Sequence, residues 1–256
     1  MTLLFLSSGV QAMVQGKEVA YSNGGEILKG YIAYDDSIKG KRPGVLVVHE
    51  WWGHNEYARK RARMLAELGY TALALDMYGD GKQARHPDEA GKFSGEVAKN
   101  LPLAKARFEA AMKFLQEQPN VDANNIAALG YCFGGSVVLQ MARLGETLKG
   151  VASFHGGLAT QTPAQPGKVK AHIISFTGAD DPMIPPEQVA AFKQEMEQAG
   201  VDYKVIVFPG VKHSFTNPAA DENGRKFSLP LAYNAAADKE SWEEARGFLA
   251  DVFREK

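Results

Sequence analysis

The sequence predicts an α/β fold in which a mostly parallel sheet of about seven to eight strands is flanked by helices. Short apolar runs bounded by turn residues alternate with segments of helical periodicity, the pattern of strands joined by crossover helices. The 256 residues are 45% hydrophobic, which is enough for one sizeable core. No internal repeat or linker-like composition divides the chain. We therefore expect residues 17–256 to form one domain.

The first predicted element is a hairpin, in which residues 17–22 and 27–34 flank Asn23-Gly24-Gly25, a strong turn signal. All-apolar runs then predict buried strands, and a period near 3.6 residues predicts helices. The predicted strands are 45–48, 71–75, 124–129, 150–154, 171–176 and 203–208, and the predicted helices are 57–68, 103–116, 136–144, 186–199 and 239–253. Two connections, 77–101 and 214–237, are long enough to be lids or binding loops.

The balance of positive and negative residues limits the classes of partner that the protein can bind. Lys and Arg total 29 against 30 Asp and Glu, so the concentrated basic surface that nucleic-acid binding requires is not expected. No apolar run reaches the roughly 18 residues of a membrane span. We expect neither nucleic acid nor membrane as a partner, but a small-molecule substrate bound by a monomer or small homo-oligomer.

The first twelve residues resemble the end of a signal peptide. The apolar segment Leu3-Leu4-Phe5-Leu6 is followed by small residues placed for cleavage after Ala12. The basic segment that normally comes first is missing, and the apolar core is short. These features favour a periplasmic or secreted protein; the alternative is a cytoplasmic protein with an apolar N-terminal tail.

One cysteine stands where a nucleophile is expected. The predicted strand 124–129 runs into Gly130-Tyr131-Cys132-Phe133-Gly134-Gly135 and then into a helix. This is the nucleophile elbow of α/β hydrolases with cysteine in place of serine. Such a turn is too tight for side chains beside the nucleophile, and the helix N-terminus favours a thiolate. The alternative is a buried structural cysteine.

An acid and a histidine follow the cysteine in the order typical of these hydrolases. Asp180 and Asp181 come directly after the predicted strand 171–176, and His213 lies in the loop before the last helix. Histidine would hold the thiolate and protonate the leaving oxygen, and aspartate would fix the imidazole tautomer. We prefer Asp181, because Asp180 would more naturally cap the loop.

The segment His49-Glu50-Trp51-Trp52-Gly53 follows the buried strand 45–48. In this fold that strand end supplies the second oxyanion donor, so we predict an oxyanion hole from the N–H groups of Trp51 and Phe133. Glu50 would lie beside the nucleophile; the alternative is a solvated turn carboxylate.

The other histidines have simpler explanations. His155 follows a strand and could line the pocket, although a hydrogen-bonded core histidine is the preferred interpretation. No histidine pair shows metal-ligand spacing with cysteine or carboxylate, and no glycine-rich nucleotide motif follows a strand. We expect no metal and no cofactor.

Taken together, these motifs resemble the dienelactone hydrolase family over nearly all of residues 17–253. The resemblance implies a Cys-His-Asp triad, an acyl-cysteine intermediate, no cofactor, and a glutamate at the position of Glu50 that contacts the cysteine and helps control its ionisation. The matching segments are His49-Glu50-x-x-Gly53, Gly69-Tyr70, Asp76-Met77-Tyr78, residues 130–135, Asp181-x-x-Ile184-Pro185 and Gly210-x-x-His213-Ser214-Phe215.

One departure from the family concerns the substrate. Members that hydrolyse dienelactone carry a carboxylate-binding arginine at the position of Asn217, and a second such arginine has no convincing counterpart in 77–101, although Lys82, Arg85 and Lys92 could restore a cation from that segment. We therefore predict a small neutral ester or lactone as substrate. The candidate pocket residues are Trp52, Tyr131, Ser214 and Asn217.

Two rival functions remain. One is a general carboxylesterase or acyl transferase on the same triad, and transfer to added alcohols would distinguish it. The other is a non-catalytic, thiol-bearing binding protein of the same fold, which would show an ordinary thiol and no turnover.

Overall fold

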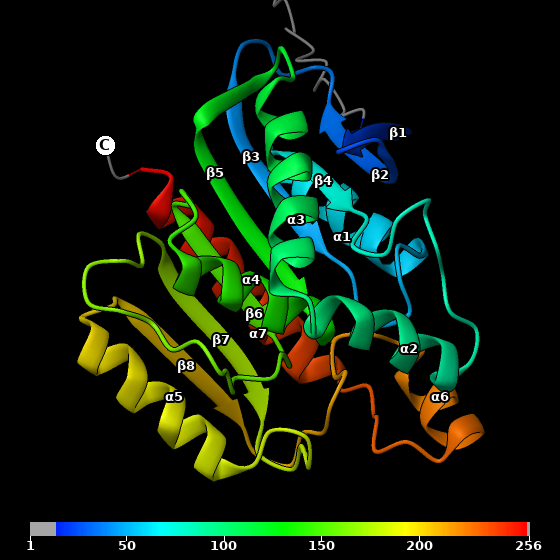
Figure 1. The fold of residues 1–256 in the computed structure, drawn as a ribbon, viewed down its shortest axis with the longest axis vertical. Coiled ribbons are helices and arrows are strands. Elements are labelled where there is room, and N and C mark those ends of the chain that lie inside the picture. The colour runs from blue at the N-terminus through cyan, green and yellow to red at the C-terminus, as the bar shows by residue number, and fades with distance from the viewer. Residues whose placement is uncertain (1–13, 255–256) are drawn as a thin grey trace, which may run out of the picture.

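A computed structural model describes residues 14–254, in which eight strands form one sheet (Figure 1). Residues 1–12, predicted as the remnant of a signal peptide, lie outside the described residues. The strands are β1 (Val14–Asn23), β2 (Glu26–Asp35), β3 (Arg42–Val48), β4 (Thr71–Leu75), β5 (Val121–Tyr131), β6 (Gly150–Phe154), β7 (His172–Gly178) and β8 (Tyr203–Phe208). Their order across the sheet is β1-β2-β4-β3-β5-β6-β7-β8.

β2 pairs antiparallel with both β1 and β4, and the other five strand pairs are parallel. The predicted hairpin is confirmed: β1 and β2 are joined at Gly24 and Gly25, whose φ angles of 53° and 91° are those of a two-residue primed turn. The mostly parallel sheet predicted from the sequence is confirmed as well. Because parallel strands share a direction, β3, β5, β6, β7 and β8 all end at one edge of the sheet.

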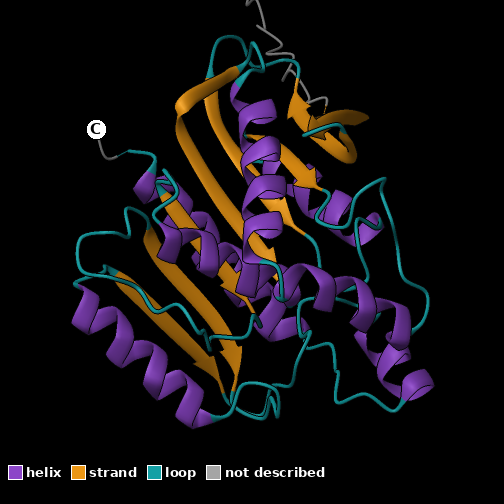
Figure 2. Ribbon diagram, viewed as in Figure 1, coloured by secondary structure: helices purple, strands orange, loops and turns teal. Residues whose placement is uncertain are grey.

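Helices cover both faces of the sheet (Figure 2). The helices are α1 (Glu56–Glu67), α2 (Pro87–Ala98), α3 (Leu101–Gln116), α4 (Phe133–Leu144), α5 (Pro186–Ala199), α6 (Ala220–Phe227) and α7 (Ala235–Val252). One hydrophobic core joins α3, α4 and α5 to one face, and a second joins α1 and α7 to the other. No helix within residues 14–254 is long and apolar enough to cross a membrane.

The all-apolar run of β3 illustrates why the sheet has two cores. Successive strand side chains point to opposite faces, so Leu46 and Val48 join one core while Val45 and Val47 join the other. All four side chains are fully buried. A strand covered on both faces therefore shows a continuous apolar run in place of an alternating pattern.

The two long connections are not loops throughout, which corrects the prediction. Residues 77–101 contain α2 and residues 214–237 contain α6. Two glycines, Gly91 and Gly95, interrupt the helical signal of α2, and α6 is only 8 residues long with Gly224 inside it. Caps decide the start of α2, since Pro87 follows the N-cap His86, whose side chain accepts a hydrogen bond from the N–H of Asp88.

Candidate active site

Cys132 occupies a strained turn between β5 and α4, with φ 53° and ψ −116°. Its N–H donates to the carbonyl oxygen of Phe154 at 2.9 Å. Glycine is required on both sides of the turn: a Cβ at Gly130 would lie 2.0 Å from the carbonyl oxygen of Gly134, and one at Gly134 would lie 2.3 Å from that of Val48. Strain of this kind, worth about 1–3 kcal/mol, persists only where the surroundings enforce it, and it is common at reactive residues.

His213 and Asp181 form a buried pair at the ends of β8 and β7. Nδ1 of His213 lies 2.7 Å from Oδ2 of Asp181, and the other carboxylate oxygen accepts the N–H of Met183 at 2.8 Å. Asp180 is exposed. The structure thus pairs His213 with the aspartate preferred from the sequence, and the carboxylate accepts a hydrogen bond from Nδ1–H of His213.

The second ring nitrogen of His213 is left available. Nε2 is buried and has no hydrogen-bond partner within residues 14–254. Burial alone lowers the pKa of His213, but the negative charges of Cys132 and Asp181 and the hydrogen bond to Asp181 outweigh it and raise the pKa to about 10. A proton on Nε2 is therefore stabilised by a thiolate at Cys132, although no hydrogen bond of ordinary geometry links the two in the unliganded site. Catalytic hydrogen bonds commonly tighten only when substrate binds.

Glu50 is buried, but its partners differ from those implied by the family resemblance. Its Oε1 accepts the hydroxyl of Ser214 at 3.1 Å, and its Oε2 accepts the side-chain amide of Asn217 at 2.5 Å. No hydrogen bond joins Glu50 to Cys132 in the described part of the chain. Burial raises the pKa of Glu50 above its ordinary value, and the hydrogen bond from Asn217 and the nearby charge of His213 act in the opposite direction.

The two residues predicted to supply the oxyanion donors, Trp51 and Phe133, line the same cavity as Cys132. Phe133 is the first residue of α4, and no side chain caps that helix end, so its N–H is left for a ligand. Trp51 lies in the segment after β3, which two hydrogen bonds hold in place. His49 donates through Nδ1 to the carbonyl oxygen of Glu50 at 2.6 Å, and the Tyr78 hydroxyl donates to that of Trp51 at 3.0 Å.

A cavity of about 290 Å³ opens next to Cys132 and His213. Trp51 and Phe133 also line it, together with residues that the sequence analysis did not identify: Gly91, Ser94, Gly95, Ala98, Met183 and Leu231. The first four are small residues of α2 spaced as positions i, i+3, i+4 and i+7, and this spacing was a readable sign of one helix face. No Lys or Arg of residues 14–254 lines the cavity, so Lys82, Arg85 and Lys92 supply no cation there.

The four candidate pocket residues do not line this cavity, and each has a specific reason. Trp52 packs into a small separate cluster with Trp51 and Phe227. The Tyr131 ring is fully buried and stacks on Phe154 with the ring centroids 4.6 Å apart. Ser214 and Asn217 are turned toward Glu50.

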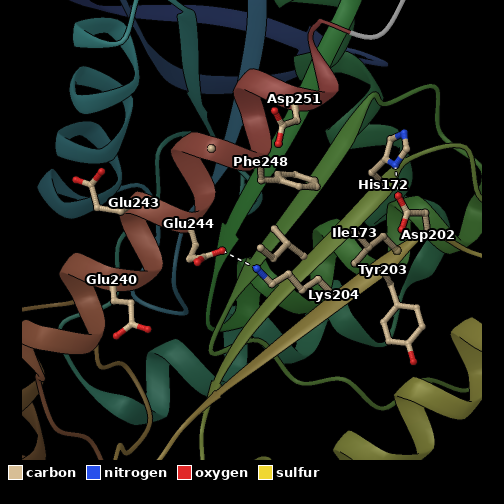
Figure 3. A pocket seen from close by; sticks show the side chains of 12 residues that line it. His172, Ile173, Asp202, Tyr203, Lys204, Glu240, Glu243, Glu244, Phe248 and Asp251 are labelled. Atoms are coloured by element: carbon tan, nitrogen blue, oxygen red, sulfur yellow. Dashed lines mark hydrogen bonds and ion pairs between the residues drawn. The ribbon is translucent and has the colours of Figure 1, made fainter.

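A different hollow, of about 420 Å³, lies between α7 and the edge formed by β7 and β8 (Figure 3). Carboxylates from Asp202, Glu240 and Glu243 line it, and Lys204 pairs with Glu244 across it at 2.7 Å. It shares no residue with the cavity at Cys132. Within residues 14–254, no group of three or more His, Cys, Asp or Glu side chains is arranged to hold a metal ion.

The mostly parallel sheet, with Cys132 on the turn after β5 and with Asp181 and His213 after β7 and β8, is the arrangement of an α/β hydrolase. Comparison with known sequences narrows the class. The sequence profile of the dienelactone hydrolase family matches residues 28–253, and the chain belongs to this family. It is a hydrolase of the group that acts on esters and lactones.

Individual relatives agree with this assignment. A protein of Aquifex aeolicus, provisionally named a carboxymethylenebutenolidase, is 29% identical over 91% of this chain and 97% of its own length. A Bradyrhizobium protein, provisionally named a 2-oxo-3-(5-oxofuran-2-ylidene)propanoate lactonase, is 26% identical over 83% of this chain and 85% of its own. The solved structure of a dienelactone hydrolase-like promiscuous phosphotriesterase from metagenomic libraries superposes with a TM-score of 0.88 at 34% identity, covering 94% of this chain and 99% of that one.

Proposed function

We propose that the protein hydrolyses small uncharged esters or lactones through an acyl-cysteine intermediate, with Cys132, His213 and Asp181 as its triad. The observation that carries the proposal is the shared cavity. A thiol on a strained turn and a histidine with a free Nε2 both face it, and Asp181 holds the opposite nitrogen of the ring at 2.7 Å.

The first half of the reaction transfers the acyl group to the enzyme. The thiolate of Cys132 attacks the carbonyl carbon, a C–S bond forms, and the carbonyl electron pair moves onto oxygen. The N–H groups of Phe133 and Trp51 stabilise this oxyanion. As the carbonyl re-forms, the C–O bond breaks, and His213 gives its Nε2 proton to the leaving oxygen.

The second half returns the enzyme to its starting state. Water attacks the thioester carbon while Nε2 of His213 accepts one of its protons. The C–S bond then breaks, its electron pair returns to the Cys132 sulfur as thiolate, and the carboxylic acid leaves. Asp181 keeps the Nδ1 proton in place throughout, so the same nitrogen serves as acid and as base.

The preference for uncharged substrates rests on the lining of the cavity. No Lys or Arg lines it, and Asn217, at the position of the family's carboxylate-binding arginine, is hydrogen-bonded to Glu50. A substrate carboxylate would lose its water without gaining an ionic partner, which costs several kcal/mol. A larger hollow of about 700 Å³ adjoins the first through Ala98 and Phe133 and offers room for the second arm of an ester; Lys99 lines this larger hollow but not the cavity at Cys132.

The test combines turnover with detection of the intermediate. Wild-type protein and Cys132→Ala are assayed on a panel of aryl esters and neutral lactones, and the acyl adduct is sought on Cys132 by mass spectrometry after rapid acid quench. We expect turnover and an adduct in the wild type, and a loss of several orders of magnitude in Cys132→Ala with its thermal stability kept. Turnover that survives in Cys132→Ala would rule out the mechanism, and an unreactive thiol without turnover would favour the binding-protein alternative.

Hydrolysis of neutral phosphotriesters is a second candidate activity. The uncharged cavity suits a triester, and the 34% identical solved structure carries the name of a promiscuous phosphotriesterase. The Cys132 thiolate would attack phosphorus, the P–O bond to an aryl group would break with a proton from His213, and water would then cleave the P–S bond. A diethyl aryl phosphate should give one equivalent of aryl alcohol as a burst; no release above the Cys132→Ala background would dismiss this activity.

A further inference from the structure

We propose that His155 is a positioning residue that holds the nucleophile and the acid–base histidine in a fixed relative geometry. This inference rests on the proposed function, because it assigns Cys132 and His213 their roles there. His155 directly follows β6, is fully buried, and touches both residues without lining the substrate cavity.

The contact with the nucleophile is made through the backbone. The N–H of Cys132 is shared between the carbonyl oxygen of Phe154 and Nδ1 of His155, at 2.9 Å and 3.1 Å. Because Nδ1 accepts this hydrogen bond, it carries no proton, and the proton of the neutral ring lies on Nε2. Cys132 and His155 also share an unusual backbone, with φ angles of 53° and 42°. The N–H of Cys132 thus joins two residues that both have a strained backbone and lie at the ends of the neighbouring strands β5 and β6.

The contact with the acid–base histidine is made through its loop. Nε2 of His155 lies 2.7 Å from the hydroxyl oxygen of Thr216, three residues after His213. The same hydroxyl oxygen is 2.6 Å from the hydroxyl of Tyr57, and Arg61 donates to the carbonyl oxygen of Thr216 at 2.8 Å. The ring of His155 also packs edge-to-face on that of His213, with centroids 5.3 Å apart.

The neutral form is essential to this role. A proton on Nδ1 of His155 would point at the N–H of Cys132 and break that hydrogen bond. Burial lowers the pKa of His155 well below its ordinary value, and the positive charges of His213 and Arg61 lower it further. Within residues 14–254, no carboxylate is hydrogen-bonded to the ring, and a backbone hydrogen bond of His155 opposes these effects only in part. His213 therefore remains the histidine that gains and loses the proton during turnover.

Three variants separate the two contacts. His155→Phe keeps a ring but loses both hydrogen bonds. His155→Asn places an amide oxygen near the Nδ1 position and loses only the link to Thr216. Thr216→Val removes this link from the other side, together with the hydrogen bond between Thr216 and Tyr57. His172→Asn, at the start of β7 outside the cavity, is the matched control.

The primary readout is the rate at which iodoacetamide alkylates Cys132 as a function of pH, which needs no substrate. We expect His155→Phe to shift the midpoint of this profile and to lower kcat about 10²-fold with little change in KM, because a misplaced nucleophile slows the chemical step. His155→Asn and Thr216→Val should give smaller shifts of the same sign, and His172→Asn none. Thermal unfolding is measured on each variant, and if His155→Phe does not fold, the other two carry the test.

Folded variants with a wild-type alkylation profile and wild-type kcat would overturn the proposal. A uniform loss of stability with an unchanged profile would also overturn it, since that indicates a purely structural histidine. A wild-type protein that turns over no ester, yet shows the expected shift in its variants, would contradict the proposed function and leave the positioning role standing.

Discussion

Replacement of Asp181 by asparagine should place the proton of His213 on the wrong nitrogen. In the wild type, Oδ1 of Asp181 accepts the N–H of Met183 at 2.8 Å, and Oδ2 accepts Nδ1–H of His213 at 2.7 Å. An asparagine can satisfy the N–H of Met183 only with its amide oxygen. Its NH₂ group then faces Nδ1, which must become an acceptor, so the neutral ring carries its proton on Nε2, toward Cys132.

The expected cost follows from this inverted tautomer. His213 can no longer accept a proton through Nε2, and the carboxylate charge that stabilises the imidazolium is gone. The corresponding substitution in serine triads lowers kcat by about 10⁴-fold, which corresponds to about 5.5 kcal/mol of transition-state stabilisation. We expect a loss of this order in Asp181→Asn, with KM little changed, because Asp181 does not line the cavity.

The assay is the initial rate on one activated aryl ester over a range of pH, compared with Asp180→Asn. Asp180 is an exposed neighbour of the same size and charge, so its substitution controls for the change in net charge. We expect Asp180→Asn to retain nearly full activity. A loss below tenfold in Asp181→Asn, or a larger loss in Asp180→Asn, would refute the assignment.

Three further outcomes are expected. Asn217→Arg should raise kcat/KM for a carboxylated lactone relative to its methyl ester, because it restores an arginine at the position where family members that hydrolyse dienelactone carry a carboxylate-binding one; an unchanged ratio would show that the new arginine pairs with Glu50 instead of with substrate. Gly95→Leu should slow hydrolysis of bulky aryl esters and spare acetates, since a Cβ at Gly95 meets no atom within 4 Å and the longer side chain extends into the cavity; equal slowing of both would mean that this helix face does not contact substrate. The pKa of His213 is raised to about 10, so the folded state binds this proton more tightly than the unfolded state; its contribution to the free energy of unfolding is full below about pH 6.5 and is lost as pH rises through about 10, which urea titrations at several pH values would detect.

The sequence was sufficient for the parts of the site that the sheet itself positions. Cys132, Asp181 and His213 each directly follow a strand or the turn after it, and parallel strands bring such ends to one edge. The buried strands could also be predicted from the sequence, because burial on both faces of the sheet requires a continuous apolar run. The strand that a residue follows therefore determines its position along this edge of the sheet.

The sequence was insufficient where a side chain chooses among several neighbours. The local sequence around Glu50 does not indicate that Ser214 and Asn217, more than 160 positions away, donate hydrogen bonds to its two carboxylate oxygens. Tyr131 is next to the nucleophile in sequence, but the alternation of β5 turns its ring into the core. The wall formed by α2 was missed because two glycines weaken a helix prediction, although they are the residues that keep the cavity open.

The construction of that wall has an evolutionary consequence. The residues of the proposed triad follow crowded strand ends, where a single added carbon at Gly130 or Gly134 collides with backbone atoms. At Gly91 and Gly95 of α2, an added carbon meets nothing within 4 Å. Mutation at Gly91 or Gly95 can therefore resize the cavity without disturbing the turn that carries Cys132. In the proposed mechanism, the residues that set substrate size and those that carry out the reaction lie on different elements, so one set can change while the other is kept.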